Sequence, residues 1–253
     1  MNTLPRRTFN LSLLSSLSTF TLVKTLNQAQ ALAAPLRPLT NHWLAEVEEL
    51  SRGMQQQRVK QIEWQQHIEA LFARVELKDL LRAIDFTRLS KQIKFPDDHE
   101  GVISTQPRAA GLPAELSFQT FIYGLSQGRA IVPHCHRNMT SMHLVIGGEI
   151  HGWHFDRVAD EPDHVLIKPT LDRALALGEA STTSDDKDNV HWFKATSGTA
   201  FTFNIGVFEI NSADKFSGRQ FYLDAANGEK RGDGTLRVRH LKMPEAYRLY
   251  GKS

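Results

Sequence analysis

The chain has 253 residues, of which 41% are hydrophobic and 23% charged, and its formal net charge is +2 at pH 7. These values are ordinary for one globular domain with accessory segments, and they exclude an intrinsically disordered chain. No run of about 18 apolar residues occurs, which excludes a transmembrane bundle, and the near-balanced charge offers no electrostatic footprint for nucleic acid.

Residues 1–31 have the pattern of a removable targeting segment. An arginine pair precedes a mild apolar stretch, a basic residue follows, and a small-x-small site ends the segment. This order resembles a twin-arginine export signal. The resemblance implies that the twin-arginine export machinery carries the folded protein to the periplasm, and that the mature form has no membrane span. A chance arginine pair on an ordinary N-terminus is the alternative. The residues concerned are Arg6, Arg7, Leu11 to Val23, Lys24 and Ala29 to Ala31.

Cleavage after Ala31 would remove three basic residues and no acidic one, so the formal charge would fall from +2 to −1. The mature chain would therefore still lack a basic surface for an anionic partner. The only cysteine is Cys135, which excludes an internal disulfide. Stability in an oxidising compartment must then come from the hydrophobic core.

Residues 32–94 are predicted to be a linker followed by helices that pack on the outside of the main domain. The segment from Trp43 to about Leu89 keeps a helical apolar stripe, in which Ile68, Leu71, Phe72 and Val75 follow the i, i+3, i+4, i+7 rule. These helices carry no recognisable chemistry.

Residues 95–253 are predicted to form the main domain, because short β-like runs bounded by Gly, Pro, Asp and Asn replace the helical pattern. Gly147 and Gly148 separate two of these runs and predict a hairpin. Many short strands without intervening helices favour a closed or double-sheet β architecture. The predicted strands are Leu116 to Leu125, Ala130 to His136, Met139 to Ile146, Glu149 to Asp156, His164 to Lys168, Val190 to Ala195, Thr199 to Val207 and Gln220 to Asp224.

A His-x-His pair, His134 and His136, lies in one of the predicted strands. Residues two apart in a strand point to the same face, so both imidazoles can aim at one point while Cys135 faces away. Two neutral imidazoles so placed form half of a site for a first-row metal ion, and a further ligand must come from elsewhere in the chain. Alternatively, His134 and His136 are a structural or accidental pair that binds no metal ion.

The surroundings of the pair are similar to the two sequence motifs of the cupin superfamily. Gly128 lies six residues before His134, glycines follow the next strand, and the single histidine His191 lies downstream, where the second cupin motif has one. The resemblance implies a mainly β cupin (jelly-roll) barrel with an N-terminal α-helical layer. The place of the family's acidic ligand falls on Thr140 or Ser141, so the resemblance implies a metal site of three histidines, His134, His136 and His191.

Within the cupins, the sequence resembles the thiol dioxygenases of the plant cysteine oxidase and 2-aminoethanethiol dioxygenase type, over roughly residues 68 to 224. The run of His-x-His, Met-Thr, Gly, His and Asp is met without gaps, and a second block surrounds His191. A later Gly-Arg element has its tyrosine one place early. The residues that carry the resemblance are His134, His136, Met139, Thr140, Gly148, His151 and Asp156, then Asn189 to Ala195, and Gly218, Arg219 and Tyr222.

This resemblance implies one Fe2+ per chain and the oxidation of a thiol, a small aminothiol or a cysteine derivative, to a sulfinic acid with O2. An acidic residue that the family carries after the third histidine falls on Phe203 or Asn204 here, and this departure favours a small thiol over an N-terminal cysteine peptide as the substrate. Two alternatives stay open. One is another metal-dependent cupin enzyme acting on a non-thiol compound, and the other is a periplasmic cupin that binds a metal or ligand without turnover.

His143 and Tyr222 are the candidate catalytic residues beside the metal ligands. By strand parity His143 shares a face with Ser141 and Val145, and so projects into the barrel as a further ligand, an acid or base, or a core histidine. Tyr222 can supply a phenol to the pocket, although a tyrosine on a barrel strand is commonly a core residue.

Overall fold

A computed structural model describes residues 40–252 except 97–98 and 109–110. The predicted export signal (residues 1–31) and the start of the predicted linker lie outside the described residues. The described residues belong to one compact unit. Among them, no helix has both the length and the apolar character needed to cross a membrane.

The predicted N-terminal helical layer is present. Its first two helices are the longest, and α2 ends where Gln57 takes a left-handed backbone conformation with φ of 59°. The polar run at residues 55–58 therefore separates two helices, and the helical segment ends at Leu89 as expected. The helices are α2 (Thr40–Gln55), α3 (Gln61–Phe72), α4 (Leu77–Ala83) and α5 (Phe86–Leu89).

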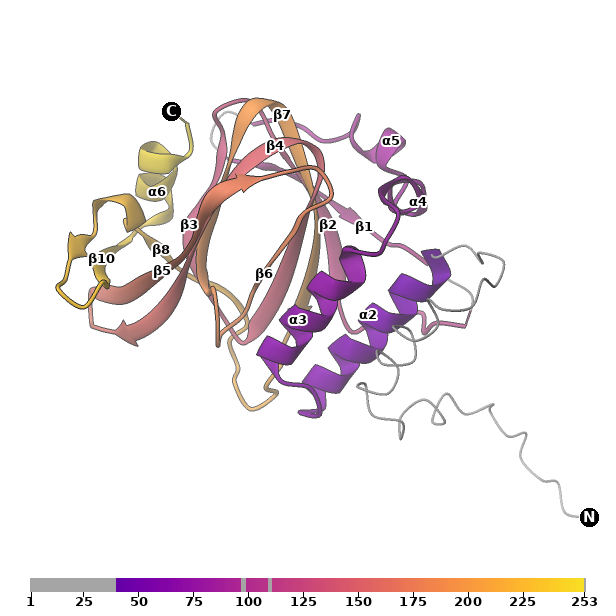
Figure 1. Cartoon of the computed structure of the whole chain (residues 1–253), viewed down its shortest axis with the longest axis horizontal. Helices are drawn as coiled ribbons and strands as arrows, with labels where there is room; N and C mark the ends of the chain where they lie inside the picture. Colours follow the sequence, from indigo (N-terminus) through magenta and orange to yellow (C-terminus); the bar gives the residue numbers. More distant parts are fainter. Residues whose placement is uncertain (1–39, 97–98, 109–110, 253) are drawn as a thin grey trace, which may run out of the picture. The chain divides into compact units, whose positions relative to one another are not determined.

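The rest of the described chain is mainly antiparallel β-structure, with a short 3-10 helix, η3 (Ala225–Asn227), and a C-terminal helix, α6 (Met243–Tyr250). Hydrogen-bonded neighbours run in the order β1-β2-β7-β3-β8-β10-β5-β4-β6, and β7 also pairs with β4. The path from β7 through β3, β8, β10 and β5 to β4 therefore returns to β7 and closes a barrel (Figure 1). The strands are β1 (Gly101–Thr105), β2 (Gln119–Leu125), β3 (Ala130–Arg137), β4 (Met139–Asp160), β5 (His164–Leu175), β6 (Ala180–Thr183), β7 (Val190–Phe208), β8 (Gly218–Leu223), β9 (Glu229–Lys230) and β10 (Leu236–Leu241).

This architecture confirms the predicted fold class, a mainly β jelly-roll barrel with helices at the N-terminal side. The sequence analysis placed no strand at residues 101–105, 180–183 or 236–241 and no helix at 243–250, although each is present. These elements are short, and three of them lie at or near the ends of the sheet path or of the chain.

The predicted hairpin at Gly147 and Gly148 is wrong, because both glycines lie inside one 22-residue strand, β4. β4 pairs with β7 from Met139 opposite Phe208 to Phe155 opposite Val190, with register shifts on both sides of Gly147. Gly148 has a φ of 68°, and a Cβ there would lie 2.4 Å from the Thr199 carbonyl oxygen. The glycines therefore allow a bulge that bends two long paired strands, not a turn that reverses one.

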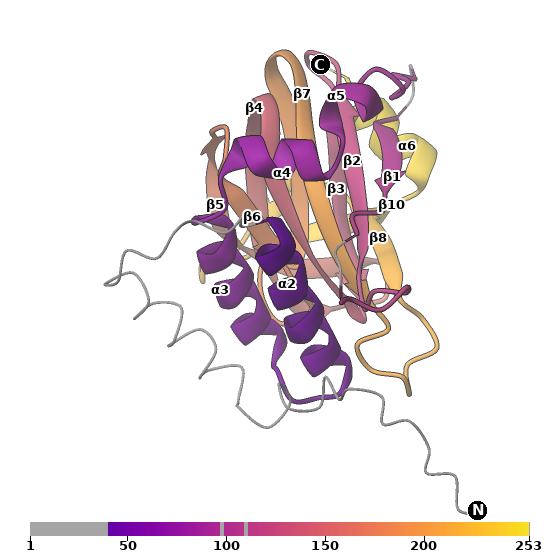
Figure 2. The same ribbon diagram turned by 90° about the vertical axis from the view of Figure 1, so that its right-hand side faces the viewer.

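The first half of β4 separates a hydrophobic face from a polar one. Met142 and Leu144 point outwards into a hydrophobic cluster that also contains the fully buried Trp43 of α2 and Trp64 of α3. These two helices lie against this face of the sheet (Figure 2). The alternate residue His143 points to the barrel interior, as strand parity predicts. The helical layer therefore covers the outer surface and leaves the inner face of these strands to the site.

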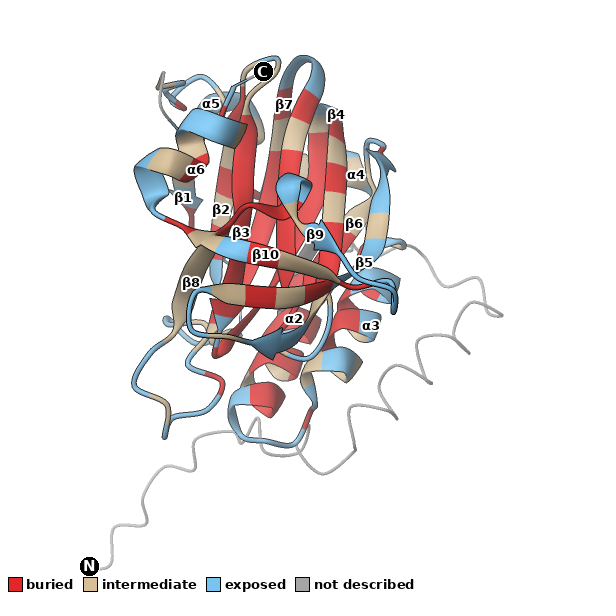
Figure 3. Cartoon of the chain, turned by 90° about the vertical axis from the view of Figure 1, so that its left-hand side faces the viewer, coloured by how far each residue is buried: buried red, intermediate tan, exposed pale blue. Residues whose placement is uncertain are grey.

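A second hydrophobic cluster lies on the face of β3 and of the first part of β7 that points away from His134 and His191. The cluster contains Cys135, Val190 and Trp192 together with residues of β5, β8 and β10. Figure 3 shows these three strands on this side of the barrel. Cys135 is fully buried, and desolvation raises the pKa of its thiol to about 11. The thiol is thus neutral and faces away from its two histidine neighbours, as the alternation predicts.

Candidate metal centre

The three predicted ligands come together on the inner face of two paired strands. His134 on β3 lies directly opposite His191 on β7, and His136 follows two residues later on the same face of β3. Directly opposite residues of an antiparallel pair have Cβ atoms about 5 Å apart. The ring centroids are accordingly 4.4 to 4.9 Å apart, and the ligand nitrogens all lie within 4.8 Å of one another. These three residues, the histidine triad from here on, are almost completely buried.

Backbone carbonyls fix the tautomers of two triad members. His134 Nδ1 lies 2.8 Å from the Val132 carbonyl oxygen, and His191 Nδ1 lies 3.1 Å from that of Asn189. A carbonyl oxygen only accepts, so each Nδ1 carries the proton and donates it. Each Nε2 then presents a lone pair to the interior, which is the usual arrangement of a metal-binding imidazole.

The donor set fits a metal ion. His191 Nε2 is buried without a hydrogen-bond partner, a state that costs roughly 1–3 kcal/mol for an ordinary buried polar atom. The Nε2 atoms of His134 and His136 are 3.0 Å apart. Two nitrogens that bind one ion at about 2.1 Å and at right angles to each other are also about 3.0 Å apart. An ion at this point would satisfy all three lone pairs, so the histidine triad can hold a metal ion.

The triad is neutral at ordinary pH. Desolvation lowers the pKa of His134 and His136 well below the usual value and that of His191 to about 3. The positive charge of Arg219 lowers all three pKa values further. Neutral imidazole is the form that binds metal ions, so protons do not compete until the solution is strongly acidic.

The place of a fourth, acidic ligand holds hydroxyl groups that are already engaged. Thr140 Oγ1 donates to the Thr183 carbonyl oxygen at 2.6 Å, and the hydroxyls of Ser141 and Thr183 are 2.9 Å apart. No carboxylate belongs to the cluster that the described residues form around the triad. The site is therefore a neutral set of three histidines, and a divalent ion in it would keep its full charge.

His143, a candidate catalytic residue, lies in the cavity wall with both ring nitrogens engaged. Its Nε2 accepts from the Asn204 amide at 3.0 Å, so its Nδ1 carries the proton and lies 3.2 Å from Thr202 Oγ1. Its ring centroid is 6.3 Å from that of His191. Desolvation, reinforced by His191 and Arg219, lowers the pKa of His143 well below the usual value. Its role as ligand, acid or base stays a prediction.

His154 is an interior histidine to which the sequence analysis gave no role. It lies directly opposite His191, its ring centroid is 5.9 Å away, and its Nε2 lies 2.8 Å from Ser181 Oγ. Burial, and next His143, lowers its pKa to about 3. His151, which carries part of the family resemblance, instead bonds Asp172 at 2.7 Å on the other face of β4. Their three-residue spacing puts these two histidines on opposite faces of β4. The pairing of His154 with His191, which is not visible in the sequence, decides which of them faces the triad.

Two members of the triad, His134 and His136, line a partly open cavity of about 150 Å³ between the two halves of the barrel. The side chains that line it are mostly aromatic, apolar or neutral polar, and the one permanently charged residue among them is Arg219. Tyr222, the second candidate catalytic residue, is not part of this described wall. Its hydroxyl accepts a bond from Arg219 at 3.3 Å, and its ring packs against α6. The lining residues are Phe121, Tyr123, Ile131, His134, His136, Met139, Ser141, His143, Asn204, Phe208 and Arg219.

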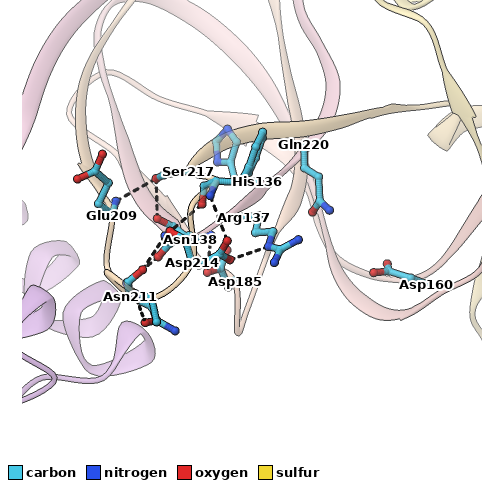
Figure 4. Close-up of polar contacts among 12 residues, drawn as sticks. His136, Arg137, Asn138, Asp160, Asp185, Glu209, Asn211, Asp214, Ser217 and Gln220 are labelled. Atoms are coloured by element: carbon cyan, nitrogen blue, oxygen red, sulfur yellow. Dashed lines mark hydrogen bonds and ion pairs between the residues drawn. The ribbon is translucent and has the colours of Figure 1, made fainter.

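A wider groove of about 590 Å³ lies on the other side of His136, at the end of β3. Asn138 organises its wall, since its amide donates to the carbonyls of Asn211 and Asp214 and its own carbonyl accepts from Ser217 (Figure 4). The charges here are largely paired within the wall, as between Arg137 and Asp214 at 2.7 Å. The groove therefore differs from the cavity, where one cation lies among neutral groups.

No protein-family model matches the chain, and no curated protein matches it. Solved structures do. Procruciferin, an 11S globulin from Brassica napus, is 11% identical over 46% of this chain and 27% of its own, with a TM-score of 0.33. Vicilin from Solanum melongena is 15% identical over 53% and 34%, with a TM-score of 0.37. A Klebsiella pneumoniae protein with a double-stranded β-helix domain is 10% identical over 53% and 93%, with a TM-score of 0.35. This chain thus spans about a third or less of the two seed globulins.

Proposed function

We propose that this protein is a cupin-type, iron-dependent dioxygenase that converts a small thiol into a sulfinic acid with O2. The observation that carries the proposal is the triad of neutral, buried imidazoles, two of which line a cavity of about 150 Å³. The reaction RSH + O2 → RSO2H is balanced, because sulfur supplies all four electrons and both oxygen atoms stay in the product. The protein then needs no separate reductant.

A ferrous ion bound by the triad would lower the pKa of a thiol ligand and orient it relative to O2. The ligand set favours a thiolate, because three neutral imidazoles cancel none of the charge of a divalent ion and an anionic ligand completes the site. The sequence resemblance to the thiol dioxygenases supports the same substrate class.

The side chains around the triad keep the cavity dry and the reactants in place. Ile131, Phe121 and Phe208 give the wall its apolar part, which limits the water that can reach a reactive sulfur. Tyr123 also lines the cavity, and burial raises the pKa of its phenol, so it remains a hydrogen-bond donor. His143 is held rigidly by Thr202 and Asn204 and fixes the shape of the wall opposite.

We also propose that the folded protein, already loaded with its metal in the cytoplasm, is exported to the periplasm by the twin-arginine route. The support is the arginine pair and the small-x-small site in residues 1–31. Loading before export would protect the site from the copper or zinc that affinity order favours. An Arg6→Lys, Arg7→Lys double variant should then stay in the cytoplasm, as fractionation would show. Full export of this variant would contradict the proposed route.

Oxygen consumption by iron-loaded protein tests the proposed reaction. Addition of cysteine, cysteamine or 3-mercaptopropionate should start O2 uptake, and mass spectrometry should find two added oxygen atoms on the sulfur. His191→Ala protein, which lacks one ligand, should show none. If iron is bound at one per chain and none of these thiols is oxidised, the thiol reaction is wrong. Full occupancy by zinc or copper without O2 uptake would favour a binding protein.

A further inference from the structure

The charge of the cavity wall restricts which thiol can enter. Arg219 lies opposite His136 in the β3–β8 pairing and reaches into the same cavity as the triad. The other lining residues are neutral, and no carboxylate is among those that the structure describes there. A divalent ion in the triad would add two further positive charges. The cavity therefore favours a ligand with more than one negative charge.

The Arg219 guanidinium is held in place and still has donors to offer. Its Nη1 donates to the Tyr222 hydroxyl at 3.3 Å, and its Nη2 lies 3.6 Å from Glu100 Oε1. The other oxygen of Glu100 accepts from the Tyr247 hydroxyl on α6 at 2.6 Å. A guanidinium carries five N–H donors, so these neighbours fix its orientation without using all of them. Glu100 is not part of the cavity wall, so a ligand inside the cavity meets the arginine and not its counterion.

We propose that the substrate is a small thiol with a carboxylate group, and that Arg219 is the specificity-determining residue that binds this carboxylate. This inference rests on the proposed function, and it narrows the substrate class of that site. Its basis is the position of a single fixed cation in the wall of the cavity that His134 and His136 also line. The forked donors of a guanidinium match the two oxygens of a carboxylate, and such charge-assisted bonds are the strong ones.

The charges around the cavity agree with this class. A divalent ion, Arg219 and Glu100 together carry +2, which a thiolate and a carboxylate neutralise. An aminothiol such as cysteamine would instead place an ammonium beside Arg219 without an acidic partner, and it should bind less tightly.

Anaerobic binding tests this inference separately from turnover. Iron-loaded protein is titrated calorimetrically, without O2, with 3-mercaptopropionate, 2-mercaptoethanol and cysteamine. The carboxylate-bearing thiol should bind about 10- to 100-fold more tightly than mercaptoethanol, the range expected for a buried charge-assisted contact, and cysteamine should bind most weakly. In Arg219→Gln protein the preference over mercaptoethanol should vanish, and Arg219→Lys should recover part of it. Arg237→Gln, which removes an arginine paired with Glu161 outside the cavity, should leave the preference unchanged.

Bound iron and affinity for mercaptoethanol show whether Arg219→Gln protein keeps its fold and site, since neither depends on the carboxylate. Equal affinities for the three thiols in the unchanged protein would overturn the inference, as would a preference that survives Arg219→Gln or a failure of every thiol to bind. Carboxylate-selective binding without O2 uptake would refute the dioxygenase reaction and leave the inference standing. Uptake of O2 with cysteamine as the best substrate would refute the inference about Arg219 and leave the dioxygenase reaction standing.

Discussion

The buried histidines of the barrel interior lie in two regions, which differ in the hydrogen bonds that the imidazole rings make. The described residues include five buried histidines, and burial lowers the pKa of each. In the triad region, main-chain carbonyls engage Nδ1 of His134 and His191 and leave each Nε2 facing the interior. In the neighbouring region, side chains engage Nε2 of His143 and His154 through Asn204 and Ser181.

Burial and neutrality therefore do not by themselves make a histidine a metal ligand. All five imidazoles are buried, yet only in the triad do the available nitrogens converge on one point. A nitrogen that already bonds a side chain would have to exchange that bond for a metal bond, whereas an unpartnered nitrogen gains a bond outright. The hydrogen-bond partner of each ring therefore decides its role.

Removal of one triad imidazole should produce the largest effect. His191→Ala removes the ligand that β7 supplies, and we expect the affinity for Fe2+ to fall by more than about 100-fold, the upper range for loss of a ligand's supporting contact. Elemental analysis after anaerobic reconstitution should find close to one iron per chain in the unchanged protein and close to none in the variant.

His143→Gln and His154→Gln are the matched controls, because each removes a buried imidazole outside the triad. Both should retain close to one iron per chain. Loss of iron in either variant to the level of His191→Ala would show that the two regions do not differ in the proposed way.

Metal binding should stabilise the folded protein by an intermediate amount. A ligand at 100 times its dissociation constant adds about 2.7 kcal/mol to the free energy of unfolding, which for a domain of this size raises Tm by roughly 5 to 10 °C. Calorimetric melting with and without Fe2+ should show this shift in the unchanged protein and in His154→Gln, but not in His191→Ala. An equal shift in His191→Ala would place the stabilising ion elsewhere.

The pH dependence of the metal-free protein is a further test. The pKa values of His154 and His191 lie at about 3 in the folded state, below the ordinary 6.5. Between these values the unfolded chain binds more protons than the folded one, so the free energy of unfolding falls as the pH falls from 6.5 towards 3. Melting across this window should therefore show a declining Tm.

The same experiment separates the two regions. His154→Gln removes one of the titrating groups, so its Tm should decline less steeply. Bound metal should leave this slope unchanged and extend the decline below pH 3, because coordinated imidazoles do not take up protons while those of the unfolded chain still do. A Tm of the metal-free protein that rises on acidification would contradict the burial argument.

Much of this molecule follows from local sequence patterns. The apolar stripe at residues 68–75 predicted a helix that is present, and strand parity placed His134, His136 and His143 on the inner face and Cys135 on the outer one. Such predictions succeed because the direction of a side chain in a helix or strand follows from its spacing along the chain.

Features that depend on distant partners were not predictable in this way. The glycines at 147 and 148 look like a turn, and only the pairing of β4 with β7 along nearly their whole lengths makes them a bend. His154 acquires its position from the strand opposite, and Arg219 reaches the cavity because β8 lies beside β3. The export signal and the identity of the metal stay predictions from sequence resemblance.

The position of the bound metal tests the central claim most directly. Crystals of anaerobically iron-loaded protein, measured on both sides of the iron absorption edge, should show one anomalous peak about 2.0–2.2 Å from the Nε2 atoms of His134, His136 and His191. The hydrogen bonds of His143 and His154 to Asn204 and Ser181 should remain. An iron peak coordinated by His143 or His154, or no peak at the triad in protein that contains iron, would contradict the account.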